Sequence, residues 1–303
     1  MDPRHLELLR ELDDRGSLTA VAEATHRTPS AVSQQLRAAQ RAFGVPLVEA
    51  HGRGLRLTAA GRVLADAGRE VASGIARAEA RWQEFRGGVR GTVTVAALPS
   101  AAAFLLPGVL AALPDGIEVV IDDVDRAERE YAALTRDHDL VVGHSLAALP
   151  EGGAAGLVVQ HLAHEPLDVA MAPEHDLVAR ERLTPEDVAS LPWVGVPLGF
   201  PFDTVRRAVE QATGQVVQVR QRVRDNRLVE ALVAGDPARE LVGILPRFTT
   251  VEGAIRLRPL DGVAARRSIL ALARPDRAER LVVRRVLDAL VTVAGEVEQR
   301  HQA

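Results

Sequence analysis

The stretch HRTPSAVSQQLRAAQRAFG, residues His26 to Gly44, decides how the first part of this chain folds. Thr28 is a favoured helix N-cap, and Pro29 suits the first helical position. Behind them, apolar residues recur at spacings of four, three and four, which places them on one face of a helix. These residues are Val32, Leu36, Ala39 and Phe43. The stretch therefore predicts a helix that buries this face against a core.

The opposite face of this helix is polar and contains no acid. It carries Ser30, Ser33, Gln34, Arg37 and Arg41, whereas an ordinary solvated face mixes charges of both signs. Gln can bind adenine and Arg can bind guanine through two hydrogen bonds, and Ser can contact bases or phosphates. The alternative is a plain solvated surface. We expect this face to contact DNA, with Arg41 as a phosphate contact or a solvated charge.

The flanking segments complete a recognised DNA-binding arrangement. Asp2 and Pro3 begin an amphipathic helix, and SLTAVAEAT, residues 17–25, predicts a second short helix before the one described above. Two short helices, a tight turn and a polar-faced helix make a helix-turn-helix. Leu47–Glu49 and Leu55–Leu57 then read as strands around a glycine-rich hairpin tip, which is a wing. Arg53 at this tip can reach a narrow minor groove. The expected DNA-binding residues are Thr28, Ser30, Ser33, Gln34, Arg37 and Arg53.

A long helix follows, from Thr58 to about Arg86. Its apolar residues form seven-spaced rows, a pattern typical of helix–helix packing between chains. The alternative is packing on its own domain. The residues expected at a dimer interface are Leu64, Val71, Ile75, Ala78 and Trp82.

After the linker FRGGVRG, residues 85–91, the pattern changes to alternating strands and helices. This alternation predicts an α/β domain. Two series of elements, with a final strand and helix that return to the first series, predict two lobes and a cleft between them. We expect a winged helix-turn-helix domain over 1–58, a linker and dimerisation helix over 59–90, and an effector-binding domain over 91–303. Lobe I would comprise 91–162 plus 266–303, and lobe II would comprise 163–265.

Composition limits the possible functions of the chain. It has 303 residues, a formal net charge of −4 and no cysteine, which excludes disulfides and thiolate metal sites. Residues 26–62 carry six arginines and one acid, so positive charge is local to the helix-turn-helix and wing. No apolar run reaches the ~18 residues of a membrane span, and the N-terminus lacks an apolar signal core. We therefore expect a cytoplasmic protein.

The whole chain resembles the LysR-type transcriptional regulator family. The ungapped match is GSLTAVAEATHRTPSAVSQQLRAAQRAFGVPLVEAHGRGLRLTAAG, and looser matches include HEPLDVAMAPEHDL, PLGFPF and LVGILPRF. The resemblance implies a homodimer or homotetramer on double-stranded DNA, with an inverted-repeat operator. It also implies an effector domain shaped like a periplasmic binding protein, and control of transcription by a small molecule.

The expected effector site lies between the two lobes. In such folds ligands bind near the carboxyl ends of strands and the N-termini of helices. Ser100 stands between the strand TVTVAAL and a helix, where hydroxyl and N–H groups suit an anion. The expected site residues are Ser100, Pro197, Gly199, Phe202, Asn226 and Ile244, and they favour a small, partly apolar anion. Alternatively, Ser100 and Asn226 only cap their helices.

A cytosolic solute-binding protein or an enzyme with an accessory helical domain is the competing class. GHSLA, residues 143–147, lacks the final glycine of a nucleophile elbow. His161, His164 and Glu165 could suggest a metal site, but Pro166 prevents the helical spacing of a zinc helix. Asp122, Asp123 and Asp125 are better explained as a solvated strand end than as a hard-metal site. We expect no catalytic residues, no metal and no cofactor.

Overall fold

The N-terminal helices begin where the sequence supplies a cap. In this computed structural model, which describes residues 1–52, 54–146, 154–198, 200 and 202–302, α1 (Pro3–Arg15), α2 (Leu18–Ala24) and α3 (Pro29–Phe43) form a helix-turn-helix domain. Asp2 and Thr28 each accept a backbone N–H of the first turn, as the sequence predicted, and Ser17 does the same for α2. The shared core includes Leu9, Leu12, Val32, Leu36 and Ala39.

The predicted wing is a two-stranded antiparallel sheet. It consists of β1 (Val48–His51) and β2 (Gly54–Leu57). Arg53, the expected tip cation, lies outside the described residues. Arg56 on β2 pairs with Glu49 on β1 at 2.6 Å, so this pair neutralises one of the arginines of the positive region.

Helix α4 (Ala59–Phe85) links the first domain to the rest of the chain and packs closely on α1. Gly68 permits this approach, and Gly61 permits a similar approach of α4 to the segment before β1. A Cβ would lie 2.2 Å from the Leu47 carbonyl oxygen at position 61, and 2.7 Å from that of Leu6 at position 68. Both glycines face backbone atoms, so a larger residue at either position would require a shift of the backbone.

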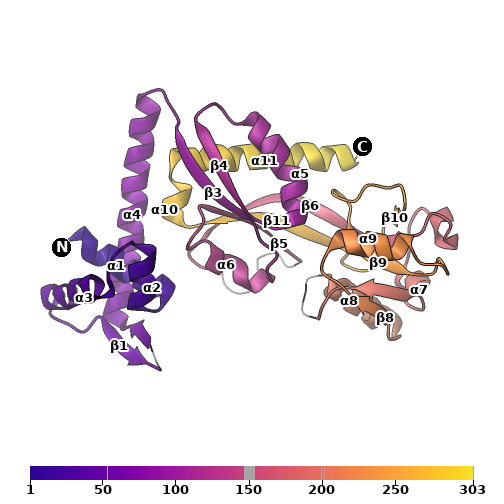
Figure 1. Cartoon of the computed structure of the whole chain (residues 1–303), viewed down its shortest axis with the longest axis horizontal. Coiled ribbons are helices and arrows are strands. Elements are labelled where there is room, and N and C mark those ends of the chain that lie inside the picture. The colour runs from indigo at the N-terminus through magenta and orange to yellow at the C-terminus, as the bar shows by residue number, and fades with distance from the viewer. Residues whose placement is uncertain (53, 147–153, 199, 201, 303) are drawn as a thin grey trace.

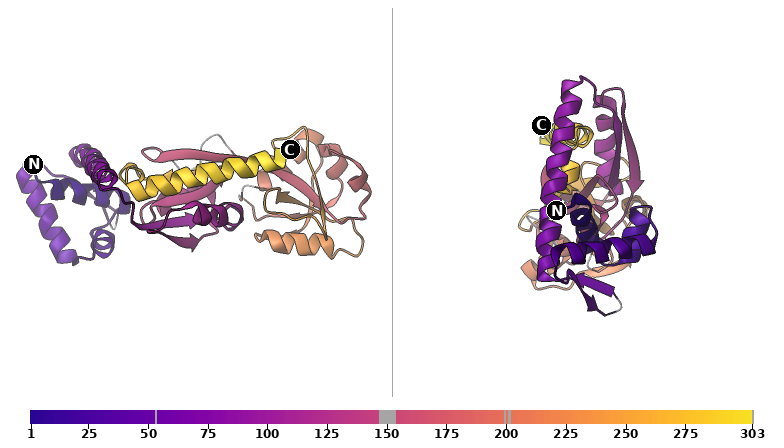
Figure 2. Two further views of the ribbon diagram at one scale, coloured as in Figure 1. Left: turned by 90° about the horizontal axis from the view of Figure 1, so that it is seen from above. Right: turned by 90° about the vertical axis from the view of Figure 1, so that its left-hand side faces the viewer.

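Lobe I is a mixed sheet covered by helices. Strands β3 (Gly91–Ala97), β4 (Ile117–Asp123) and β5 (Leu140–Ser145) run parallel, and β11 (Arg266–Ala273) lies antiparallel beside β5. The remaining elements are α5 (Pro99–Ala112), η1 (Glu128–Glu130), α6 (Tyr131–Leu134), α10 (Pro275–Ala278) and α11 (Leu281–Gln302). The closing strand and helix thus return to the first lobe, and α11 runs along it toward lobe II (Figure 2).

Lobe II has its own core around Trp193, whose indole donates to the Val188 carbonyl oxygen at 2.9 Å. Its strands are β7 (Pro192–Gly195), β8 (Gln218–Arg222), β9 (Val242–Pro246) and β10 (Arg256–Arg258). Its helices are η2 (Asp176–Ala179), α7 (Pro185–Val188), α8 (Asp203–Thr213) and α9 (Asn226–Ala234). Figure 1 shows the helix-turn-helix domain, lobe I and lobe II in a row.

Strand β6 (Val158–Met171) joins the two lobes. It pairs with β11 as far as Pro166 and with β9 from Leu167, so one strand serves both sheets. The stretch PLDVAMAP, residues 166–173, predicts a strand that begins only at Pro166. The first part of β6 was missed because a bulge buries both Leu162 and Ala163, and this interrupts the period of two. Within the described ranges, no helix is long and apolar enough to cross a membrane.

Candidate functional site

The polar face of α3 is open in the structure. Gln34, Arg37 and Arg41 are exposed, Ser30 is exposed and Ser33 is half-buried, while Val32, Leu36 and Ala39 are buried behind them. Within the described part of the chain, neither Arg37 nor Arg41 has an ion-pair partner. Both guanidinium groups are therefore available to a negatively charged surface.

Two groups fix the position of this helix. The Thr28 hydroxyl accepts the Ala31 N–H at 3.3 Å and lies 3.1 Å from the Ser30 hydroxyl. Gln35, which the sequence analysis did not single out, donates to the Arg4 carbonyl oxygen of α1 at 2.6 Å. Thr28 thus caps α3, while Gln35 holds α3 to α1.

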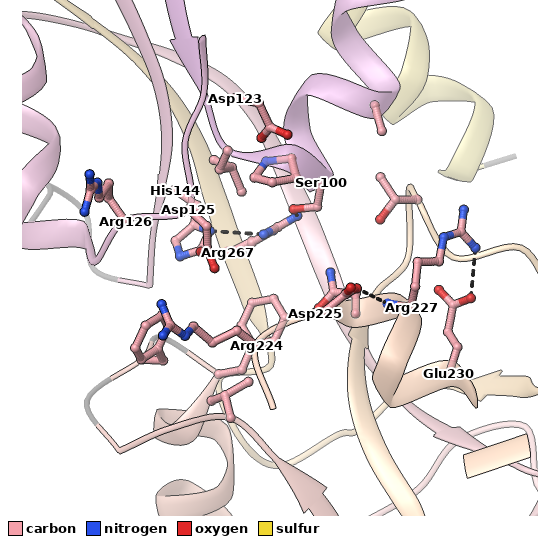
Figure 3. Close-up of a pocket in the computed structure, with 18 of the residues that line it drawn as sticks. Ser100, Asp123, Asp125, Arg126, His144, Arg224, Asp225, Arg227, Glu230 and Arg267 are labelled. Atoms are coloured by element: carbon pink, nitrogen blue, oxygen red, sulfur yellow. Dashed lines mark hydrogen bonds and ion pairs between the residues drawn. The ribbon is translucent and has the colours of Figure 1, made fainter. Parts of the chain in front are cut away.

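A cavity of about 500 Å³ lies between the lobes. Its lobe I wall comes from the β3–α5 corner, the end of β4 and β5, and its lobe II wall comes from the loop after β7 and the start of α9. Four arginines and four acids of the described residues line it. They are Arg126, Arg224, Arg227, Arg267, Asp123, Asp125, Asp225 and Glu230. Figure 3 shows their side chains around the space.

Arg267 forms the floor of this cavity and is 1% exposed. Its guanidinium lies 2.6 Å from the carboxylate of Glu165, which is itself fully buried. The same group donates to the Ser100 hydroxyl at 2.9 Å and lies 3.0 Å from Nδ1 of His144 (Figure 3). It also lies over the Phe202 ring, 5.4 Å from its centroid. Arg267 therefore connects both lobes at the base of the cavity.

His144 is held neutral by this arrangement. Burial, followed by the adjacent Arg267 charge, lowers the pKa of His144 well below its usual value. Since a guanidinium only donates, Nδ1 accepts and the ring proton resides on Nε2. In the described part of the structure, Nε2 is buried without a hydrogen-bond partner. The cavity wall thus contains an unused donor.

The expected effector residues divide between the cavity and its surroundings. Ser100, Phe202 and Asn226 line the cavity. Pro197 does not line it, although its neighbour Val196 does. Ile244 does not line it either: it is 6% exposed and packs in the lobe II core. Gly199 lies outside the described residues.

At the two helices that begin at the cavity, the observed N-cap residues are not Ser100 and Asn226. The N-cap of α5 is Leu98, which has no side-chain acceptor, and Ser100 is in the first turn. The N-cap of α9 is Asp225, which accepts the Arg227 N–H at 2.8 Å, and Asn226 follows it. Neither Ser100 nor Asn226 is therefore the N-cap residue of its helix.

The sequence analysis missed the buried cluster of Arg267, Glu165 and His144. Two signals could have indicated it. His144 is the next-to-last residue of β5, a strand that is apolar before it, and it therefore lies at the carboxyl edge of a parallel sheet. Arg267 and Glu165 occupy buried strand positions that normally exclude unpaired charge. Their pairing across β6 and β11 follows only from the sheet register, where Arg267 faces Glu165.

Helix α4 leaves a partly apolar face uncovered. Val71, Ile75 and Trp82 are 39%, 52% and 59% exposed, and Ala78 is exposed as well. Trp82 stacks on Phe85 with centroids 5.7 Å apart. Leu64 differs, because it is partly buried and packs against the core of the N-terminal domain.

A helix-turn-helix with a free polar face, joined to two lobes around a cavity, defines a DNA-binding protein that responds to a small ligand. Family models agree with this class. Residues 3–62 match the bacterial regulatory helix-turn-helix protein, lysR family, and residues 86–295 match the LysR substrate binding domain. The chain belongs to the LysR family of transcriptional regulators, whose members are regulators and not enzymes.

Three relatives illustrate the similarity. The transcriptional regulator GbpR of Rhizobium radiobacter is 26% identical over 212 residues, 68% of each chain. Full-length CbnR, solved with its target DNA, has a TM-score of 0.53 at 19% identity and covers 97% of this chain and 100% of its own. The regulatory domain of CcmR from Synechocystis PCC6803, solved with 2-PG, has a TM-score of 0.56 at 17% identity. That match covers 68% of this chain and 98% of the CcmR chain.

Proposed function

We propose that this regulator binds an inverted-repeat operator through α3 and the wing. The observation that carries the proposal is the acid-free, exposed polar face of α3, where Arg37 and Arg41 lack ion-pair partners among the described residues. Gln34 and Arg37 read base edges, Ser30 and Ser33 contact bases or phosphates, and Arg53 reaches an A/T-rich minor groove. CbnR, which has a similar fold, was solved on its target DNA. DNA binding places the protein in the cytoplasm.

The same proposal includes a homodimer or homotetramer. Val71, Ile75, Ala78 and Trp82 form an exposed, partly apolar row on α4. Val71 and Ile75 also line a groove of about 390 Å³ between α1, α4 and α10, which a second helix could enter. A two-fold axis through paired α4 helices would present two copies of α3 to one face of the DNA, which accounts for an inverted repeat.

The effector in this proposal is a small molecule with an anionic end. That end lies at the start of α5, where the Ser100 hydroxyl and the first backbone N–H groups of the helix are donors. The Ser100 hydroxyl accepts from Arg267, so its own proton remains available. Since four acids also line the cavity, the anion is confined to one end of the ligand. The structure of CcmR with 2-PG shows that a domain of this fold takes a small ligand.

Ligand response tests the effector assignment. A thermal-shift screen with small carboxylates and aromatic acids should find stabilising compounds, because a ligand that binds only the folded state raises stability by mass action. In Ser100→Ala and Asn226→Ala that stabilisation should fall or vanish. Loss of a purely structural contact would instead lower stability equally with and without ligand, by roughly 1 kcal/mol. If both variants retain the parent's dissociation constant, these residues do not form the effector site.

A further inference from the structure

Charged side chains connect the helix-turn-helix domain to lobe I. Arg10 of α1 lies 2.9 Å from Asp276, and Arg274 lies 3.1 Å from Asp14. Arg15 lies 2.9 Å from Asp137. We call this group the domain latch, and its members are Arg10, Glu11, Asp14, Arg15, Asp137, Arg274 and Asp276.

The centre of the latch is buried. Arg274, Glu11 and Arg10 are 7%, 8% and 9% exposed. Glu11 accepts from Arg15 at 2.9 Å and from Arg10 at 3.0 Å. Burial raises the pKa of Glu11, but the three neighbouring arginines outweigh burial and hold that pKa below its usual value. Charged side chains as buried as Glu11, Arg10 and Arg274 indicate a specific contact between the domains.

Charge, and not apolar packing, holds this contact together. In the described part of the chain, no cluster of buried apolar side chains combines residues before Phe85 with residues after Gly91. Polar contacts between domains resemble those of transient complexes. Two buried donors, Nε of Arg10 and Nη2 of Arg274, also lack partners among the described residues. Opening the contact would let water hydrogen-bond to both donors. The free energy lost by burying them unpaired in the closed state would then be regained, which lowers the cost of opening.

The latch is continuous with the floor of the effector cavity. Strand β11 carries Arg267 near its beginning, and Arg274 follows its last residue, Ala273. The strand lies between β5 and β6 and is buried over most of its length. Lobe I therefore presents one end of this strand to the cavity and the other to α1.

We propose that the domain latch opens and closes reversibly, and that its closed state fixes the orientation of the DNA-binding domain on lobe I. This inference rests on the proposed function, because a fixed orientation regulates only a protein whose α3 reads DNA. In the closed state, the relative position of the two copies of lobe I in a dimer determines the distance between the two α3 helices. In the open state, each DNA-binding domain is held by α4 and the exposed ion pairs beside it, such as Arg77 with Glu279 at 3.1 Å.

Distances between spin labels test the latch without DNA or effector. The chain has no cysteine, so Glu23→Cys on α2 and Asp288→Cys on α11 introduce two exposed labelling positions. Labelled chains are diluted into an excess of unlabelled chain, and the distance is measured by pulsed electron–electron double resonance. The parent should give one narrow distribution. Arg274→Gln and the milder change Asp276→Asn, at a partly buried position, should broaden it or add a second distance.

Arg285→Gln is the matched control, because Arg285 is an exposed arginine of lobe I and has no ion pair among the described residues. It should keep the narrow distribution. A parent that is already broad, or latch variants that remain as narrow as the parent, would overturn the inference. If Arg274→Gln does not fold, Asp276→Asn alone decides between these outcomes.

A second measurement connects the latch to DNA. The latch variants should change affinity for a two-half-site operator by about fivefold or more, the lower end of typical coupling between sites, and leave single half-site affinity unchanged. An equal loss on the half-site would assign the effect to a damaged DNA-binding domain and contradict the inference. A parent that binds no DNA sequence would instead contradict the proposed function, whatever the label distances show.

Discussion

We expect single residues on α3 to differ in whether they read bases or only attract DNA. Gln34 and Arg37 are exposed on the same acid-free face as Arg41, but they lie nearer the start of the helix. The N-terminal part of a recognition helix meets base edges, whereas phosphate contacts position the protein without sequence information. The three side chains should therefore behave differently when they are removed.

Gln34→Ala and Arg37→Ala should each lose about 1–3 kcal/mol of discrimination between the operator and an operator with one changed base. Arg41→Ala is the matched control: any loss of affinity should be the same on both sequences. Fluorescence anisotropy with labelled duplexes measures each affinity. Equal discrimination by all three variants and the parent would mean that α3 is not the reading helix.

Stability should depend on pH through His144. Burial and the Arg267 charge depress the pKa of His144 in the folded chain, so the unfolded chain takes up this proton first. The stabilisation is fully present above the unfolded pKa near 6.5, and it declines as pH falls below that value, by up to about 1.4 kcal/mol per pH unit. His144→Gln should make the decline shallower below pH 6.

Urea unfolding followed through Trp193 fluorescence provides this comparison, because Trp193 is buried in lobe II. The difference between the parent and His144→Gln at pH 8 serves as the reference for effects unrelated to titration. A parent and variant with parallel pH profiles would show that His144 is not held neutral by the fold.

The side chains that line the cavity were only partly predictable from sequence. Ser100 and Asn226 were predicted because they stand at helix starts of a two-lobed fold, Phe202 was predicted from the loop that resembles the family's second-lobe loop, and all three line the cavity. Ile244 was predicted from its place in the strand LVGIL, but its side chain packs in the lobe II core. Arg267 and Glu165 were missed because their pairing depends on the register of two strands about 100 positions apart.

At the scale of elements, local signals placed the helices and most strands. Asp2 and Thr28 cap their helices as predicted, Ser17 caps α2, and Leu6, Leu9 and Leu12 form a buried stripe on α1. Strand β6 shows where local signals fail, since its bulge breaks the alternation on which strand prediction depends. Strand β10 is three residues long and was not predicted at all.

The glycines of α4 should respond in opposite directions to alanine. At Gly61 a Cβ would lie 2.2 Å from the Leu47 carbonyl oxygen, so Gly61→Ala should destabilise the chain by more than its gain in helix propensity, which is about 1 kcal/mol. At Gly74 a Cβ would meet open space, so Gly74→Ala should stabilise by about 0.5–1 kcal/mol. Urea unfolding measures both, and a shift of the same sign would contradict the close packing of α4.

The uncovered face of α4 should carry assembly. Val71→Glu combined with Ile75→Glu should convert the oligomer to monomer, because each new charge would be buried without a partner at the interface. Val216→Glu, an equivalent change at an 87% exposed position of lobe II, should leave the mass unchanged. Light scattering reports the mass. An oligomer that survives the double change would place the interface elsewhere.

At the scale of the whole molecule, the three parts lie in a row, with the DNA-binding face at one end and the cavity between the lobes (Figure 1). Lobe I is the common element, since it contributes Ser100 and Arg267 to the cavity and Arg274 to the contact with α1. The arrangement accounts for a regulator in which one domain reads DNA and another senses a ligand.

Selection from random duplexes tests whether this molecule recognises a specific DNA sequence. Purified full-length protein is mixed with random-sequence DNA, bound duplexes are recovered and sequenced over several rounds, and the selection is repeated with Gln34→Ala. We expect an enriched inverted repeat with A/T-rich flanks, and a changed preference within each half-site for the variant. Binding without enrichment of any sequence, or the same enriched sequence from the parent and Gln34→Ala, would contradict it.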